Sequence, residues 1–159
     1  MSEIHESFEH GGNLKLGHSV VIEKDVVVGD NVTLGNFVVL KKGTRIGDNV
    51  VMADYCCTTG PCKIGNGVKI RTRSTVSRCV IVEDDVFIAA GVMTAHTKHI
   101  GSGVTYETRI GKGSIIGSMS NILAGSHIPP ETTIGAGTNV VKPLPASGFY
   151  VGNPARKME

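Results

Sequence analysis

An aliphatic side chain recurs at every sixth residue of this 159-residue chain, and this period constrains the fold more than any other feature. The series runs in one register from Leu16 to Ile100, with threonine at two of its positions. After a displacement of four residues it resumes at Ile110 and continues to Val140. A fixed period of this length is typical of solenoid proteins, in which each repeat stacks on the next.

The residue four places after each aliphatic is also apolar or small, as at Val20, Val26 and Val32. One outward residue between two inward residues is the alternation of a short β-strand, so the other three residues must turn the chain. Gly, Asn or Asp occupies many turn positions, because these residues adopt a left-handed backbone at low cost. The pattern predicts an all-β triangular prism with three parallel strands per coil, in which residues eighteen apart stack. A β-sandwich would not keep one register through so many steps.

The chain is predicted to form a single hexapeptide-repeat domain over residues 1–159. The coils occupy about residues 16–145, which is about seven coils of eighteen residues. A short loop at 101–107 breaks the register, and residues 146–159 form an exit segment.

Composition narrows the partners and the compartment. The formal net charge of +2 argues against a general nucleic-acid binder, and no apolar run is long enough to cross a membrane. The first ten residues, MSEIHESFEH, lack the features of a secretory signal. The four cysteines show no paired CxxC spacing, which favours free thiols in a reducing compartment. We therefore expect a cytoplasmic protein with no nucleic-acid or membrane partner.

When the outward strand residues are sorted by threes, one column is mostly apolar. It contains Val21, Val39, Cys57, Thr75 and Met93, with Ile115 and Thr133 as its extension if the displacement is an insertion in one turn. A column that faced solvent would not be this apolar. We expect this face to pack against other copies of the chain in a homotrimer.

A second column gathers polar and ionisable residues. It contains Val27, Arg45, Lys63, Ile81, His99, Asn121 and Asn139. His99 is predicted to be the outward residue of the last strand before the loop at 101–107. A loop beside an outward histidine is typical of an acceptor pocket, so Asn121 in the same column is a candidate acceptor ligand.

Three segments of the chain resemble the hexapeptide-repeat acyltransferases. The first is the repeat itself. The second is DVFIAAGVMTAHTKH at residues 85–99, which is similar to the segment of sugar O-acetyltransferases that ends in the catalytic histidine. The third is IGAGTNVVKPLP at 134–145 with VGNPARKM at 151–158, which resembles the final coil and exit of that family.

The resemblance implies a left-handed parallel β-helix that assembles as a trimer. It implies that acetyl-CoA lies along the outside of the C-terminal coils at a subunit interface. The acetyl group would pass to a hydroxyl or an amine of a sugar or nucleotide-sugar. No metal is required for this chemistry. Whether the transfer is to oxygen or to nitrogen stays open, as does the identity of the acceptor.

The family's catalytic roles can be assigned to residues of this chain. The resemblance places the general base on His99, with His96 as the second candidate, and a donor to the oxyanion on Ser118 or a nearby backbone N–H. In the stack His96 lies over Arg78, and a neighbouring cation disfavours a protonated imidazole. Arg78 belongs to a basic stretch without acidic residues between Asp54 and Glu83, so we expect it to attract a phosphorylated acceptor.

The coenzyme is expected to follow small residues that would let its pantetheine arm approach the backbone. The predicted outward positions are Gly117, Ser118, Ser120, Ala124, Gly125, Ala136, Gly137 and Thr138. Lys142 and Arg156 match places where members of the family hold the phosphates of CoA.

Two other functions remain open. Zinc enzymes of the carbonic-anhydrase-like branch need a close histidine pair separated by four residues, whereas His96 and His99 are separated by two. A non-catalytic prism that serves as an assembly module is the other alternative. Stoichiometric zinc would favour the former, and acetyl-CoA binding without turnover the latter.

Overall fold

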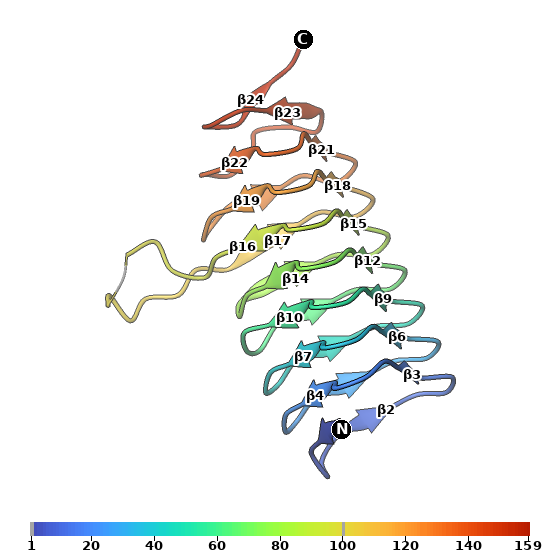
Figure 1. Ribbon diagram of the computed structural model, residues 1–159. Helices are drawn as coiled ribbons and strands as arrows, with labels where there is room; N and C mark the ends of the chain where they lie inside the picture. The colour runs from blue at the N-terminus through green and yellow to red at the C-terminus, as the bar shows by residue number, and fades with distance from the viewer. Residues whose placement is uncertain (1, 100) are drawn as a thin grey trace.

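The computed structural model describes residues 2–99 and 101–159, and in this part of the chain it consists of short β-strands without a helix. No helix therefore meets the length and hydropathy of a membrane span among the described residues. The strands stack coil on coil into a tapering column with the two termini at opposite ends (Figure 1).

Three sheets form the three sides of the column, and we name them sheets A, B and C. In sheet A the strands are β1 (Glu3–Ile4), β4 (Val21–Ile22), β7 (Val39–Leu40), β10 (Cys57–Thr58), β13 (Thr75–Val76), β16 (Met93–Thr94), β19 (Asn121–Ile122) and β22 (Asn139–Val140). In sheet B they are β2 (Glu9–His10), β5 (Val27–Val28), β8 (Arg45–Ile46), β11 (Lys63–Ile64), β14 (Val80–Val82), β17 (Thr108–Ile110) and β20 (His127–Ile128). In sheet C they are β3 (Lys15–Leu16), β6 (Thr33–Leu34), β9 (Val51–Met52), β12 (Lys69–Ile70), β15 (Phe87–Ile88), β18 (Ile115–Ile116), β21 (Thr133–Ile134), β23 (Phe149–Val151) and β24 (Arg156–Lys157).

Strands of successive coils pair in parallel, and before the loop partners lie eighteen residues apart, as Arg45, Lys63 and Ile81 do in sheet B. Only the final pair, β23 with β24, is antiparallel among the described strands. The predicted left-handed parallel β-helix is confirmed. It has about eight turns instead of seven, because a coil precedes Leu16. The sequence pattern did not reveal this coil because His10 interrupts the aliphatic series. At the open end of the column the side chain of His10 is exposed and needs no burial.

The interior of the column is filled by the aliphatic series and by the residue four places later. Ile22, Leu34, Ile70 and Ile116, for example, are at most 1% exposed. Burying each such side chain contributes roughly 1.5–3 kcal/mol. Cys62 also points inward, and burial raises the pKa of its thiol to about 12, so this thiol stays protonated.

The turns between sheets B and C are held by a ladder of Asx side chains. Asp48 accepts a hydrogen bond from the backbone N–H of Asp30 at 2.8 Å, and Asn66 accepts one from Asp48 at 2.8 Å. Each carbonyl or carboxylate oxygen therefore ties its coil to the preceding one. A Cβ at Gly29 would collide with the Asp48 carboxylate, and the same close approach of an Asx oxygen explains the glycines at Gly47 and Gly65.

The break in the register is longer than predicted. Strand β16 ends at Thr94 and β17 begins at Thr108, so the loop spans residues 95–107 and not only 101–107. Partners across it lie 28 residues apart instead of 18, as for Met93 and Asn121. Continuing the coil would have placed Lys98 in an inward slot, and burying an unpaired ammonium is costly. We call residues 95–107 the histidine loop; its Ile100 lies outside the described residues.

This longer loop reassigns the columns that follow it. Asn121 and Asn139 continue the column of Met93 in sheet A, whereas Arg109 follows Ile81 in sheet B. The predicted extension of the apolar column by Ile115 and Thr133 is wrong, since both lie in sheet C. The apolar stretch of sheet A therefore ends at Met93, whose side chain is 49% exposed.

Candidate functional site

The histidine loop leaves the column at the corner where the chain passes from sheet A to sheet B, which we call the A–B corner. The loop projects sideways from the column between β16 and β17 (Figure 1). Its two ends are joined, because the backbone N–H of Tyr106 donates to the carbonyl of His96 at 2.9 Å. Lys98 Nζ lies 4.7 Å from the centroid of the Tyr106 ring, and both side chains pack over Gly125 of the next coil. The loop is thus anchored on the C-terminal coils.

His96 stands at the base of this loop, two residues after β16. Its side chain is half-buried. Burial, together with the neighbouring Arg78 guanidinium, lowers the pKa of His96 below the ordinary histidine value. The expectation that Arg78 disfavours a protonated His96 is confirmed. A neutral imidazole is the form that accepts a proton, so this residue is suited to act as a base at neutral pH.

His99 does not occupy the position predicted for it. It lies in the histidine loop and not in a strand, and Arg109 of β17 occupies the sheet B position that it was expected to fill. Its side chain is exposed, and its backbone carbonyl accepts a hydrogen bond from Thr97 Oγ1 at 2.9 Å. The positional argument for His99 as the base is therefore lost.

Arg78 and Asn121 come from the coils on either side of His96. Arg78 is exposed at the A–B corner of the preceding coil, and Asn121 lies in β19, which pairs with β16. The Asn121 amide donates from Nδ2 to Asn139 Oδ1 at 2.7 Å. The structure thus brings Arg78 and His96 to the A–B corner on consecutive coils, whereas Asn121 lies within the sheet A strand of the next coil, in register with Met93.

Ser118 lies at the other end of sheet A, at the corner where the chain passes from sheet C to sheet A, which we call the C–A corner. It is half-buried, three residues before β19, and its carbonyl accepts the N–H of Gly137 at 2.8 Å. Within one copy of the chain, Ser118 and His96 stand at opposite ends of the sheet A strands. The structure does not bring the candidate base and the candidate oxyanion donor together.

Several small residues predicted to face outward face inward instead. Ser120 and Thr138 are fully buried and Ala124 is 1% exposed. The Ser120 hydroxyl donates to the carbonyl of Gly135 at 2.9 Å, and Thr138 Oγ1 accepts from the N–H of Gly152 at 3.2 Å. Ser120 and Thr138 occupy the inward slot four places after an aliphatic residue, so they hold coils together and cannot contact a ligand outside, and Ala124 is buried in the turn after β19.

The glycines of this group differ among themselves. A Cβ at Gly117 would lie 2.5 Å from the backbone nitrogen of Ala136, so stacking of the coils alone requires glycine there. Gly125 is covered by Lys98 and Tyr106. Gly137 has open space where its Cβ would be, and Ala136 is exposed. The accessible small residues are therefore Ser118, Ala136 and Gly137, all at the C–A corner.

The two predicted phosphate ligands lie on different sides of the column. Lys142 is exposed at the A–B corner after β22, and Arg156 is exposed in β24 of sheet C. One copy of the chain therefore does not present them to a single phosphate group. The basic stretch is divided in the same way, since Lys63 lies in sheet B and Lys69 in sheet C. Because each side of the prism takes six residues, basic residues six positions apart lie on different faces of the column.

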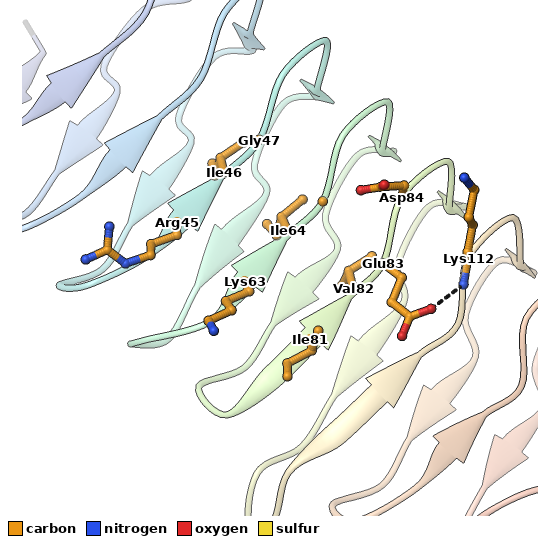
Figure 2. Close-up of a pocket in the computed structure, with 11 residues that line it drawn as sticks. Arg45, Ile46, Gly47, Lys63, Ile64, Ile81, Val82, Glu83, Asp84 and Lys112 are labelled. Atoms are coloured by element: carbon orange, nitrogen blue, oxygen red, sulfur yellow. Dashed lines mark hydrogen bonds between the residues drawn. The ribbon is translucent and has the colours of Figure 1, made fainter.

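A hollow of about 490 Å³ lies on sheet B beside the turns to sheet C (Figure 2). Arg45 and Lys63 form one side of it, and Glu83 forms another. The Glu83 carboxylate accepts hydrogen bonds from Arg109 Nη1 at 3.1 Å and from the Lys112 backbone N–H at 2.9 Å. Arg109 Nη2 also bonds Glu107 at 3.0 Å, so this network fixes the far end of the histidine loop. Sequence reasoning missed it, because the wrong loop length concealed that Glu83 and Arg109 are neighbours.

Over residues 2–99 and 101–159, no cluster of three His, Cys, Asp or Glu side chains could hold a metal ion.

Comparison with known proteins finds the same repeat in other sequences. A family model described as "Bacterial transferase hexapeptide (six repeats)" matches residues 9–42 and again residues 25–60. Residues 9–60 of the chain therefore carry the hexapeptide repeat that this model describes. Among related sequences, it is 32% identical over 96 residues to the serine acetyltransferase of Escherichia coli strain K12, which covers 59% of this chain. The chain spans 34% of the length of that enzyme.

Solved structures share the fold of this hexapeptide-repeat chain. A point mutant of AntD, an N-acyltransferase from Bacillus cereus in complex with dTDP and coenzyme A, has a TM-score of 0.64 and 22% identity, covering 95% of this chain and 82% of that one. The UDP-N-acetylglucosamine O-acyltransferase (LpxA) of Moraxella catarrhalis has a TM-score of 0.69 and 20% identity, covering 98% and 71%. At these identities the likeness concerns the β-helix alone.

Proposed function

We propose that this chain is an acyltransferase that moves an acetyl group from acetyl-CoA to a hydroxyl or an amine of a sugar or nucleotide-sugar. The observation that carries the proposal is the half-buried imidazole of His96 at the base of the histidine loop, where burial and Arg78 lower its pKa. The match to serine acetyltransferase over 96 residues supports the same reaction class.

The chemistry of the step assigns a role to each group. The acceptor oxygen or nitrogen attacks the thioester carbonyl and forms the new ester or amide bond, while the imidazole removes its proton. The carbon–sulfur bond breaks, and the sulfur of CoA leaves with its electron pair and regains a proton from the imidazolium. Ser118 or a backbone N–H beside it would stabilise the negative charge that develops on the carbonyl oxygen.

His96 is a stronger candidate for the base than His99. Burial and the neighbouring Arg78 lower the pKa of His96, which favours its neutral form, and its place at the corner is set by the end of β16. His99 is exposed in the histidine loop and has lost the strand position that supported it. Arg78 and Asn121, on the adjoining coils, would contact the acceptor.

The acyl donor fits the C–A corner. Ser118, Ala136 and Gly137 leave the backbone accessible there, and a thin pantetheine arm can approach it closely. Lys142 and Arg156 stay candidates for the phosphates of CoA, but only if different copies of the chain supply them. The same argument holds for the reaction itself, since His96 and Ser118 occupy opposite ends of sheet A.

We therefore propose that the working form is a homotrimer in which His96 of one copy meets CoA on the C–A corner of another. The sheet A column that carries Val21, Val39, Cys57 and Met93 would form the contact between copies. The four free cysteines fit a reducing compartment, the cytoplasm.

A screen of CoA release tests the reaction. Nucleotide-linked amino sugars and simple sugars are each incubated with acetyl-CoA and the protein, and thiol formation is followed. Release that depends on one acceptor class supports the proposal. Saturable acetyl-CoA binding without release on any acceptor would contradict it and favour a non-catalytic assembly module.

A further inference from the structure

The C–A corner carries a column of residues with a left-handed backbone, each two positions before a strand of sheet A. The column consists of Ser19, Phe37, Tyr55, Arg73, Gly91, Met119 and Gly137, with φ between +53° and +70°. Most other left-handed positions of the chain hold Gly, Asn or Asp, which tolerate this backbone. A bulky ring at such a position is strained. Phe37 and Tyr55 keep this strain in two successive coils, which points to a use beyond folding.

The two rings form an exposed platform. Phe37 and Tyr55 stack with centroids 5.0 Å apart and an interplanar angle of 9°. They remain 46% and 53% exposed, so the stack buries only part of their surface. The Arg73 guanidinium lies 6.0 Å from the centroid of the Tyr55 ring in the next coil. Aromatic faces beside a guanidinium attract flat, conjugated groups.

The platform opens into a hollow that reaches the proposed donor site. The hollow is about 330 Å³ and is lined by Tyr55, Arg73, Gly91, Ser118 and Met119, among others. Gly91 leaves a gap in the column, and the Met119 side chain folds over that gap. Met119 is unbranched and 68% exposed, so it can swing away and leave room for a ligand.

The charge at this corner favours an anion. Arg71 and Arg73 are both exposed here, and in the part of the chain that the structure describes Arg73 makes no salt bridge. The nearby Asp54 carboxylate is occupied in the turn, where Oδ1 accepts the backbone N–H of Asn36 at 2.7 Å. The donors of Arg73 are therefore available for a phosphate.

We propose that the C–A corner binds a nucleoside phosphate, with its base packed against the exposed edge of the Tyr55 ring and its phosphate held by Arg73. Two sources fit this chemistry, namely the nucleotide of a nucleotide-sugar acceptor and the adenosine phosphate of CoA. This inference rests on the proposed function, because that function supplies the reason for a nucleotide to bind here. Binding itself can be measured without turnover.

The test uses Tyr55→Asn, because asparagine removes the ring and relieves the backbone strain at the same time. The variant is expected to fold with an unchanged or higher melting temperature. Calorimetry with UDP, dTDP, ADP and CoA at one fixed salt concentration should show affinity weakened about tenfold or more for the nucleotide that binds. Ser19→Asn, in the same column but without loss of a ring, is the matched control and should bind as wild type does. Arg73→Gln should weaken a diphosphate more than the matching nucleoside.

Other outcomes would overturn the proposal. One is an equal Kd for wild type and Tyr55→Asn, and another is the lack of saturable binding of all four probes. A third is a change of sedimentation in Tyr55→Asn, since it would make the rings a contact between copies.

The pattern of probes identifies the source. Binding of ADP and CoA alone assigns the corner to the acyl donor, and binding of UDP or dTDP assigns it to the acceptor. Nucleotide binding without CoA release on any acceptor would leave this site standing and overturn the proposed reaction. CoA release that is unaffected by Tyr55→Asn would leave the proposed reaction standing and overturn the nucleotide site.

Discussion

The A–B corner and the C–A corner, at the two ends of the sheet A strands, differ in almost every respect. The A–B corner is built around the histidine loop, in which Lys98 and Tyr106 cover Gly125 and His96 is half-buried next to Arg78. The C–A corner has no inserted loop, and in the C-terminal coils its residues are small and leave the backbone accessible. One corner offers a proton acceptor and the other offers space for an extended ligand.

The difference shows that a repeat fold can separate the parts of a site on a single copy. The strands of sheet A lie between His96 and Ser118, so neither corner can perform acyl transfer by itself. Stacking repeats around a threefold axis would bring the A–B corner of one copy to the C–A corner of the next.

Removing the imidazole of the A–B corner has the largest expected effect. His96→Ala should lower kcat by about 10²–10⁴-fold, the range for loss of a general base, with acetyl-CoA affinity nearly unchanged. Steady-state CoA release measures the first and calorimetry the second. His99→Ala, in the same loop, provides the comparison and should lose less activity. A larger loss in His99→Ala would return the role of base to His99.

Separating the copies should abolish activity by another route. Met93→Asp places a charge on the apolar column of sheet A and should dissociate the trimer, because an unpaired carboxylate is costly in an apolar contact. Sedimentation velocity measures the assembly. Phe87→Asp, an exposed position of sheet C, is the control. Should Met93→Asp sediment as wild type does while Phe87→Asp dissociates, the contact lies on sheet C.

A bulky side chain at the C–A corner should weaken binding of the acyl donor without changing the action of His96 as the base. Ala136→Phe puts a ring where the pantetheine arm is expected, and should raise KM for acetyl-CoA by about tenfold or more with the fold intact. Ala146→Phe, at an exposed alanine of the exit segment, should leave KM unchanged. Equal KM values in both variants and wild type would place CoA elsewhere.

The smallest expected effect is on the pH profile. Because burial and Arg78 lower the pKa of His96, its imidazole stays neutral to lower pH than an ordinary histidine does. Arg78→Gln removes the smaller of these two causes, so the pKa should rise and the acidic limb of kcat/KM should move to higher pH. A limb that stays in place, or moves to lower pH, would mean that another group titrates.

The sequence predicted the fold well and the site only in part, for one physical reason. Before Ala95 every coil has the same length, so the six-residue period determines which residues pair, as Lys63 and Ile81 do. The loop conceals where the coil stops, because His99 and Ile100 happen to continue the phase. The inward position of Lys98 was the available signal. An error of six residues equals one side of the prism, so it shifted every later column by one sheet.

Burial explains the second group of errors. Ser120 and Thr138 occupy the same inward slot as Val20, and their small polar side chains suggested a surface. A hydroxyl is tolerated inside because it bonds the backbone of the next coil, as Ser126 Oγ does with the carbonyl of Val140 at 3.0 Å. That partner depends on how the coils stack, which composition alone does not reveal.

We propose that the two corners of sheet A, contributed by different copies, form one site. Mixing His96→Ala with Ala136→Phe, after unfolding and joint refolding, tests it most directly. Each variant alone is nearly inactive at low acetyl-CoA concentration, but a random mixture should recover about a quarter of the wild-type rate, since that fraction of sites combines an intact A–B corner with an intact C–A corner. A mixture no more active than the average of the two variants would contradict the claim.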